Sequence, residues 1–267
     1  MHTVKALAAT ALVALFGIIA VPEPAAAAPA PDLLPTAHGG DLTIQPIHHA
    51  SLMLTWNHQH ILVDPAPLGR EEINAAIGQF KIYPTPQVIL ITHIHGDHFN
   101  VPILQAVAGA DTTIIAPRNV YEKMPADLQA KTHVLANGEH TVVDEIPIDA
   151  VPMYNTTPAR SKYHPKGLGN GYILTLGARR IYIAGDTEPA PALRHLRHIY
   201  VAFIPMNLPF TQTVQEAAKW VKEFRPQYVY PYHYRNMDGS LSDVQQFRRL
   251  VGHASHVLLR NWYQTGG

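Results

Sequence analysis

The chain has 267 residues, with 20 basic and 20 acidic side chains, and its formal net charge is zero. It contains no cysteine, which excludes disulfides, thiolate metal ligands and a lipid-modified amino-terminal cysteine. The balanced charge, without a basic stripe, argues against nucleic acid as a partner. After a short leader, the remaining length suits one large α/β domain with a full core.

The amino terminus is typical of a secretory signal peptide. Lys5 precedes the apolar run 6–21, and small residues follow before the expected cleavage point. We expect cleavage after Ala27, because a cut after Ala28 would place Pro29, which lacks a backbone N–H, behind the scissile bond.

This leader defines the predicted domain organisation and the expected location. Its apolar run is short and alanine-rich for a membrane-spanning helix, so we expect no stable membrane span after cleavage. Residues 1–27 are the predicted signal peptide, residues 28–40 a Pro/Ala/Gly-rich linker, and residues 41–267 the folded domain. The mature protein is expected to be exported to the periplasm.

Short apolar runs separated by turn residues follow, and they predict a mixed α/β domain. In its first half we expect strands over residues 42–47, 51–56, 60–64 and 87–92, and helices over 70–80 and 100–109. Asn57-His58, between the second and third of these strands, is suited to a tight hairpin turn.

The second half is again rich in strands. We expect them over residues 141–154, 171–176, 179–184, 201–205, 227–232 and 256–259. Thr213 and Glu216 form a capping-box pattern before an amphipathic helix. Ser242 and Gln245 repeat this pattern before a helix expected over residues 243–252.

The segment that carries the most chemistry is Thr92-His93-Ile94-His95-Gly96-Asp97-His98-Phe99, directly after the apolar run 88–91. In an extended chain its first two histidines point to the same side, and a turn at the glycine can return Asp97 and His98 toward them. Four ligands then surround two adjacent metal positions. A histidine-rich surface loop is the alternative, but a chance match to this spacing has an expectation of only about 0.003 in a chain of this composition.

This motif resembles the signature of the metallo-β-lactamase-fold hydrolases, Thr-His-x-His-x-Asp-His at the end of a strand. The resemblance extends over nearly all of the chain after the leader. It implies a four-layer αββα sandwich, in which two sheets face each other between outer helices. It also implies hydrolysis by a metal-activated hydroxide at two divalent cations, with Zn²⁺ expected and Mn²⁺ or Fe²⁺ as alternatives.

The resemblance extends the ligand set beyond the motif. Asp186, in Gly185-Asp186-Thr187, matches the family's bridging aspartate, and His233, in Tyr232-His233-Tyr234, matches its late histidine. A turn-capping aspartate and a half-buried strand-end histidine are the structural alternatives. The expected metal ligands are thus His93, His95, Asp97, His98, Asp186 and His233, and Asp97 is also expected to act in catalysis by orienting the hydroxide.

One ligand of the family is missing from its usual position. Before the aspartate strand, where the family usually has a histidine, this chain has Met153-Tyr154-Asn155-Thr156-Thr157. His164, in the next loop, is the nearest downstream candidate to complete the shell of the first two motif histidines. Water, Asn155 or the substrate are the alternatives.

Two strand-end residues in the amino-terminal half are expected to border the site. They are His49, in His49-Ala50-Ser51, and Asp64, in Val63-Asp64-Pro65. Asp64 is expected to orient a ligating imidazole through its second nitrogen. A turn aspartate held by the following proline is the alternative.

Basic residues surround the additional histidine. Arg160, Lys162 and Lys166 flank His164, and we consider them as candidates to bind an anionic group of the substrate. A solvated basic loop is the simpler interpretation. The remaining histidines carry no motif: we expect surface positions for His133, His140, His195, His198, His253 and His256, and solvated or packed positions for His48, His58 and His60.

The segments around His49, Asp64, Asp186 and His233 resemble one branch of the family in particular. That branch contains ascorbate-6-phosphate lactonase and N-acyl-phosphatidylethanolamine phospholipase D, and it implies a small-molecule substrate with an ester, lactone or phosphodiester bond. Two other functions stay open. The same ligand set holds iron in family members that reduce or activate oxygen, which would make the chain an oxidoreductase, and a non-catalytic metal-binding protein is the third possibility.

Overall fold

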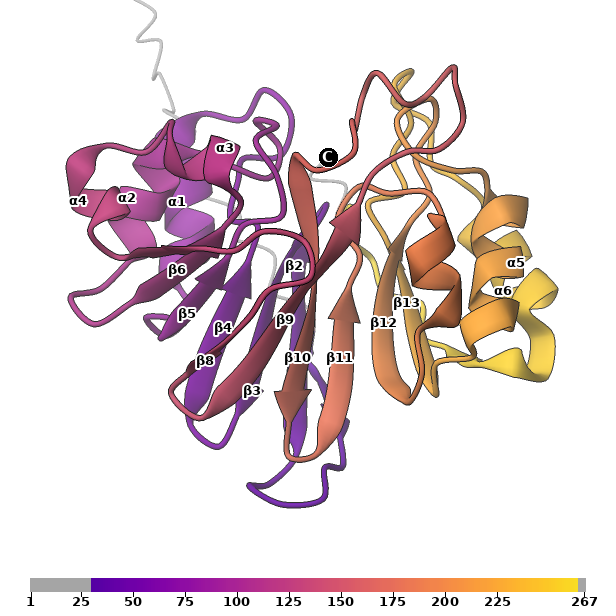
Figure 1. Cartoon of the computed structure of the whole chain (residues 1–267), viewed down its shortest axis with the longest axis horizontal. Coiled ribbons are helices and arrows are strands. Elements are labelled where there is room, and N and C mark those ends of the chain that lie inside the picture. The colour runs from indigo at the N-terminus through magenta and orange to yellow at the C-terminus, as the bar shows by residue number, and fades with distance from the viewer. Residues whose placement is uncertain (1–29, 264–267) are drawn as a thin grey trace, which may run out of the picture.

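The computed structural model describes residues 30–263, so the predicted signal peptide and its cleavage site lie outside the described residues. Two seven-stranded sheets pack face to face, and helices cover both outer faces (Figure 1). This arrangement is the four-layer αββα sandwich that the family resemblance implied. Among residues 30–263, no helix has the length and apolar character needed to cross a membrane.

The first sheet contains the strands of the amino-terminal half in simple chain order. These are β1 (Asp32–Leu34), β2 (Leu42–His48), β3 (Ser51–Trp56), β4 (Gln59–Val63), β5 (Val88–Leu90), β6 (Thr113–Ala116) and β7 (Thr132–Val134). The pairings from β1 to β4 are antiparallel. Those from β4 to β7 are parallel.

The second sheet repeats this arrangement. Its strands are β8 (His140–Val143), β9 (Ile146–Met153), β10 (Gly169–Leu176), β11 (Arg179–Ile183), β12 (Ile199–Pro205), β13 (Tyr228–Tyr232) and β14 (His256–Val257). The pairings from β8 to β11 are antiparallel, and those from β11 to β14 are parallel. The carboxyl ends of β2, β4 and β5 therefore meet at one edge of their sheet, and those of β9, β11, β12 and β13 meet at one edge of theirs.

Those two edges lie together in the folded chain. The backbone N–H of His233, after β13, donates to the carbonyl of His49, after β2, at 3.0 Å. The N–H of Asn170, in β10, donates to the carbonyl of Thr92, after β5, at 2.9 Å. Strand-end residues of both sheets are thus brought to a common rim, which is the place where ligands usually bind in α/β folds.

Helices bury apolar faces on the outside of each sheet. The first sheet is covered by α1 (Ile73–Lys81), α2 (Val101–Val107), α3 (Arg118–Tyr121) and α4 (Ala126–Gln129). The second is covered by α5 (Val214–Phe224), α6 (Val244–Val251) and the 3-10 turn η1 (Pro191–His195), and a further 3-10 turn, η2 (Gly252–Ala254), follows α6. The capping box of α5 forms as predicted: Thr213 and Glu216 bond each other's backbone N–H.

The structure differs from the predicted elements at four points. Strand β1 lies inside segment 28–40, which the sequence placed in a linker, so folded structure begins before residue 41. The predicted strand 141–154 is a hairpin, because Asp144 and Glu145 adopt positive φ and turn the chain. Strands β6 and β7 and the four-residue helices α3 and α4 were not predicted. Helix α6 is capped by Asp243, whereas the hydroxyl of Ser242 donates to the carbonyl of Met206.

Candidate metal centre

The histidine motif follows β5 at the common rim, and its side chains converge there as expected. His93 Nε2 and His95 Nδ1 face each other at 3.0 Å, and His164 lies with them in one group of possible ligand atoms. Asp97, His98 and His233, with His49 beside them, form a second group. The sequence motif therefore supplies members of two adjacent groups.

Asp186 lies between the two groups. Its Oδ1 is 3.5 Å from His98 Nε2, and its Oδ2 is 3.5 Å from His164 Nε2 and 3.4 Å from His233 Nε2. The preceding Gly185 has φ +65°, and a Cβ there would meet Met153 Sδ at 2.6 Å. A glycine is therefore required to turn the chain after β11 and aim Asp186 into the rim.

The donor atoms fit divalent cations. His98 Nε2, His164 Nε2, both ring nitrogens of His233 and Asp186 Oδ1 are buried and have no hydrogen-bond partner within residues 30–263. Such orphaned polar atoms are costly unless something completes their shells. Two ligands of a tetrahedral zinc ion lie about 3.3 Å apart, and the separations of 3.0 to 3.5 Å given above match that spacing.

The electrostatics of the cluster favour positive charge at the same place. Burial alone would lower the pKa of His98, but Asp186, Asp64 and Asp97 raise it to about 10. Burial alone would raise the pKa of Asp97, but His98, His233 and His49 hold it well below its usual range. A buried position flanked by three carboxylates is one where a cation is strongly favoured.

The other imidazoles are held neutral, which is the form that binds metals. Burial lowers the pKa of His93 and His233 well below the usual value, and lowers that of His164 to about 3. Burial also raises the pKa of Asp186 to about 7. The carboxylate of Asp186 is thus destabilised by burial, and a bound cation would restore its charge.

Asp64 orients His98 from behind. Its Oδ2 accepts from His98 Nδ1 at 2.7 Å, and its two oxygens also accept from the backbone N–H and the hydroxyl of Thr92, each at 2.7 Å. The carboxylate is fully buried. This bond to Nδ1 fixes the ring and directs Nε2 at the cluster, which is the arrangement expected of a carboxylate that orients a ligating imidazole.

We expect Asp64→Asn to weaken metal binding without unfolding the chain. The amide keeps one oxygen for Thr92 but loses the charge that holds His98, and loss of such a partner typically costs about 10- to 100-fold in metal affinity. Competition with a zinc chelator measures the dissociation constant. Asp111→Asn, at an exposed turn, is the matched control, and equal zinc affinity in the two variants would contradict the orienting role.

His49 lies at the edge of the second group and is held from two sides. Its Nε2 is 3.0 Å from Asp97 Oδ2, its Nδ1 is 2.8 Å from the hydroxyl of Tyr263, and its ring lies 3.7 Å from that of His233. His49, Asp64 and His233 all have positive φ, at 53°, 43° and 44°. Left-handed backbone costs about 1–3 kcal/mol per residue, and such strain is typical of functional sites.

The loop after β9 carries His164 to the cluster. Asn155, whose side-chain N–H groups donate to the carbonyls of Phe210 and Arg160, ties the start of the loop down. His164 Nδ1 lies 3.1 Å from the same Phe210 carbonyl, to which it donates, so Nε2 faces Asp186 with a free lone pair. Asn155 therefore positions His164, whereas His164 itself reaches the shell of the first two histidines.

Arg160 braces this loop and is not available to a substrate. Its Nε lies 2.9 Å from Glu188, and its two terminal nitrogens lie 2.8 Å from Glu216. The sequence-based expectation that Arg160 binds an anion is therefore wrong, because these carboxylates occupy its guanidinium. The hydrogen bonds with Arg160, outweighing partial burial, also lower the pKa of Glu216 to about 2.

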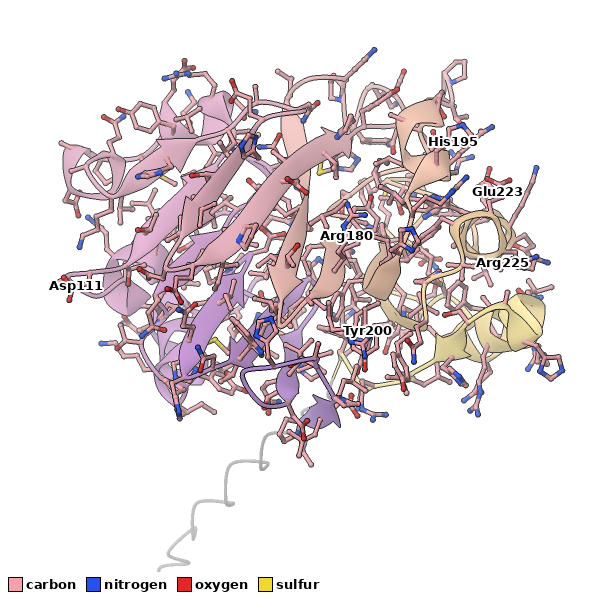
Figure 2. The ribbon with its side chains drawn as sticks, turned by 60° about the horizontal axis from the view of Figure 1, so that its bottom comes forward. Asp111, Arg180, His195, Tyr200, Glu223 and Arg225 are labelled. Atoms are coloured by element: carbon pink, nitrogen blue, oxygen red, sulfur yellow. The ribbon has the colours of Figure 1, made fainter. Side chains whose placement is uncertain are left out.

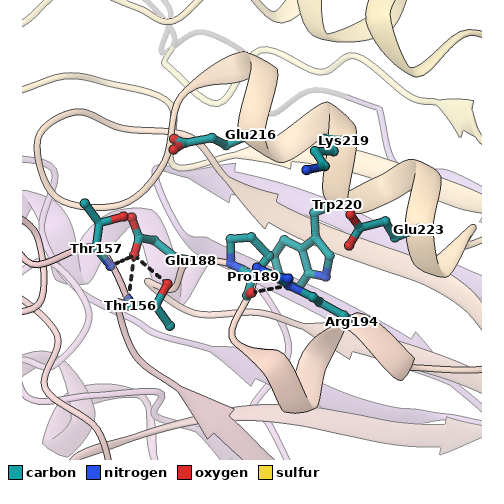
Figure 3. Close-up of a pocket in the computed structure, with 9 residues that line it drawn as sticks. All are labelled: Thr156, Thr157, Glu188, Pro189, Arg194, Glu216, Lys219, Trp220 and Glu223. Atoms are coloured by element: carbon teal, nitrogen blue, oxygen red, sulfur yellow. Dashed lines mark hydrogen bonds between the residues drawn. The ribbon is translucent and has the colours of Figure 1, made fainter.

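Glu188, two residues after Asp186, links this brace to the backbone of the loop. Its Oε2 accepts from the N–H groups of Thr156 and Thr157 at 2.5 and 2.6 Å. Figure 3 shows these bonds beside a cavity of about 220 Å³ whose lining also includes Trp220. None of the candidate metal ligands lines that cavity, so it is separate from the metal centre.

Lys166 and the remaining histidines of residues 30–263 are not part of the ligand groups. Lys166 is exposed, and its ammonium lies over the ring of Tyr154 at 5.6 Å. All six histidines expected at the surface are exposed, and His195 projects from η1 in Figure 2. His48 is buried and packed, with its ring nitrogens bonded to Gln79 and the carbonyl of Ala66. None of His48, His58 and His60 belongs to a ligand group.

Sequence reasoning missed three residues that support the side chains of the cluster. Tyr263 bonds His49 from 214 positions away, and the carbonyl of Phe210 bonds His164 across 46 positions. Glu188 holds the loop on which His164 lies. Only Glu188 left a local signal, as a carboxylate close behind the Gly185-Asp186-Thr187 motif.

Two facing mixed sheets with this cluster on their common rim define a metallo-β-lactamase-fold metal-dependent hydrolase. Residues 43–233 match the model of the beta-lactamase superfamily domain. The chain belongs to this superfamily.

Relatives and solved structures agree with this assignment. A metal-dependent hydrolase of Pyrococcus furiosus is 32% identical over 206 residues, which cover 74% of this chain and 88% of the relative. A crystal structure from Parabacteroides distasonis, described as a metal-dependent hydrolase, is 40% identical, covers 87% of this chain and 99% of its own, and superposes with a TM-score of 0.76. A metallo hydrolase from Ignicoccus hospitalis shares the fold at 19% identity, with a TM-score of 0.66 and coverage of 82% and 94%.

Proposed function

We propose that this chain is a binuclear zinc hydrolase that cleaves an ester, lactone or phosphodiester bond of a small molecule. The observation that carries the proposal is the position of Asp186, whose two oxygens face orphaned histidine nitrogens from both groups. A carboxylate in that position is suited to bridge two cations. His93, His95 and His164 would hold one of them, and Asp97, His98 and His233 the other.

When bound, two divalent cations lower the pKa of water to near neutrality and stabilise developing negative charge on the substrate. The chain's own residues then orient the reaction. Asp97 is the candidate for this task, because its side chain is 41% exposed and is bonded by His49 at 3.0 Å, with His233 Nε2 3.4 Å away. Its carboxylate can accept a hydrogen bond from the attacking water while His49 holds it in position.

The proposal is tested with mature protein of measured metal content. Samples loaded with Zn²⁺, Mn²⁺ or Fe²⁺ are assayed against p-nitrophenyl acetate, dihydrocoumarin and bis(p-nitrophenyl) phosphate, which represent the three bond types. We expect turnover of at least one probe that requires metal and that a chelator abolishes. Absence of hydrolysis with two ions bound, together with redox activity of the iron form in an anaerobic titration, would instead support the oxidoreductase.

We also propose that the protein is exported and cleaved after Ala27. The support is the basic start, the apolar run and the small residues before this position. Mass spectrometry of the periplasmic fraction is expected to give a chain beginning at Ala28. Protein that is recovered from the membrane with Met1 still attached would contradict cleavage.

A further inference from the structure

Arg235 carries an unpaired guanidinium close to the metal centre. It follows His233 by two residues, and its backbone N–H donates to the hydroxyl of Tyr263 at 3.2 Å. Its guanidinium lies over the ring of Tyr263 at 4.4 Å. The same Tyr263 hydroxyl is bonded to His49, which in turn contacts Asp97. Tyr263 therefore contacts both Arg235 and His49, and so connects Arg235 to the side chains of the second group.

This guanidinium lacks the partners that a half-buried cation normally has. Within residues 30–263 it forms no ion pair, and its Nε is buried without an acceptor. An unsatisfied charged donor is costly when it is removed from water. The contact with the phenol ring holds the guanidinium in place and leaves its terminal N–H groups free to donate. Such N–H groups can bind two oxygens of a carboxylate or phosphate group.

The backbone around Arg235 is well supported, so the side chain starts from a defined place. Arg235 pairs with Leu241 in an isolated antiparallel bridge. Asn236 donates its N–H to the carbonyl of Ser240 at 2.8 Å, and its side-chain oxygen accepts from the N–H of Leu208 at 2.8 Å. A binding group on a braced loop loses little conformational entropy when it meets a ligand.

Other arginines show what is particular about Arg235. Arg160 is occupied by Glu188 and Glu216, and Arg260 is paired with Asp32. Arg179 is the informative comparison, because it also lies over a tyrosine ring, at 4.5 Å, and also has a buried Nε without a partner. It begins β11, however, whereas Asp186 follows the other end of that strand, so a strand length of roughly 15 Å separates them.

We propose that Arg235 binds a negatively charged oxygen group of the substrate, a carboxylate or a phosphate, and so makes the enzyme selective for anionic substrates. The inference rests on the proposed hydrolase function, since it places the scissile bond at the cluster and the anionic group at Arg235. Arg235 also replaces Arg160 and Lys166 as the residue that recognises the anion.

The test compares charged and neutral probes in matched variants. Mono-p-nitrophenyl succinate and p-nitrophenyl 3-phosphonopropionate carry a carboxylate and a phosphonate, a phosphate analogue, away from the scissile ester, and p-nitrophenyl acetate is neutral. We expect Arg235→Gln to raise the KM for at least one anionic probe by about 10- to 100-fold, the loss expected for a charge-assisted hydrogen bond. The KM of Arg235→Lys for the anionic probes should lie between those of the wild type and Arg235→Gln, because lysine keeps the positive charge but lacks the paired donors of the guanidinium. The KM for the neutral probe should be unchanged in Arg235→Gln. In Arg179→Gln the KM should be unchanged for all probes.

Two results would overturn the inference: an unchanged KM for both anionic probes, or an equal rise for the neutral one, which would indicate a structural role. If Arg235→Gln does not fold, the same comparison is made with Arg235→Lys. If the wild-type enzyme turns over none of the probes, the hydrolase proposal fails separately. Calorimetric titration with inorganic phosphate and with succinate then tests whether Arg235 binds anions. Weaker binding of either anion to Arg235→Gln than to Arg179→Gln supports it, and equal binding refutes it.

Discussion

Replacing Asp186 by alanine is expected to abolish hydrolysis while leaving the fold intact. The carboxylate faces His98, His164 and His233 at 3.4 to 3.5 Å, so under the proposed function its loss would remove the ligand shared by both cations. Two cations would then lie close together without an anion between them. Because activation of water depends on those cations, we expect kcat/KM to fall by roughly three orders of magnitude or more.

The measurement combines kinetics, metal analysis by mass spectrometry and thermal unfolding. The melting temperature of the metal-free Asp186→Ala protein should not fall, because burial already disfavours the charged form of this carboxylate and raises its pKa to about 7. Asp111→Ala is the control, since Asp111 lies on the periphery in Figure 2 and is exposed. Near-normal turnover by Asp186→Ala with two bound ions would remove Asp186 from the site.

Much of the fold was accessible from local pattern. Strand β12 is a continuous apolar run, and helix α5 carries both a capping box and an apolar face. The region between α2 and β8 was not accessible in this way. Its helices α3 and α4 have four residues each, and its strands β6 and β7 have four and three, which is too short for a periodicity to show.

Within the site, the sequence predicted the side chains that lie close together along the chain. Three histidines and Asp97 lie within six residues, so the motif predicted their convergence, although the structure places them in a loop with a bend and a turn after β5 and not on an extended strand. The support of these ligands depends on long-range contacts. The hydroxyl of Tyr263 and the carbonyl of Phe210 reach the histidines only because both sheets end at one rim. A basic loop likewise gave no indication that Glu188 and Glu216 would occupy Arg160.

The repeated order of strand pairings accounts for the symmetry of the cluster. Asp64 follows β4, the fourth strand of its sheet, and Asp186 follows β11, the fourth strand of the other. The two carboxylates lie on opposite sides of one imidazole: Asp64 is 2.7 Å from His98 Nδ1, and Asp186 is 3.5 Å from His98 Nε2. The loops between the second and third strands also correspond, and they carry His49 and His164.

His164 supplies the second prediction with a large expected effect. The family's usual histidine is absent at Tyr154-Asn155, and the structure places His164 Nε2 in the group of His93 and His95, with no hydrogen-bond partner. Under the proposed binuclear zinc function, we therefore expect His164→Ala to reduce bound zinc from two ions toward one per chain, and activity to fall with it. Asn155→Ala should keep two ions but bind one of them more weakly, by about 10- to 100-fold, because it loosens the loop that orients His164.

Zinc titration of both variants, read as the metal-to-protein ratio after gel filtration, separates the ligand from its support. His195→Ala, which removes an exposed histidine, controls for adventitious zinc binding at the surface. The reverse result, in which His164→Ala keeps two ions at unaltered affinity and Asn155→Ala loses one, would assign the position to Asn155. Two ions at unaltered affinity in both variants would leave water or substrate to complete the shell.

His164→Ala should also have less influence on the thermal unfolding of metal-free protein than on that of loaded protein, because His164 Nε2 forms no hydrogen bond within residues 30–263.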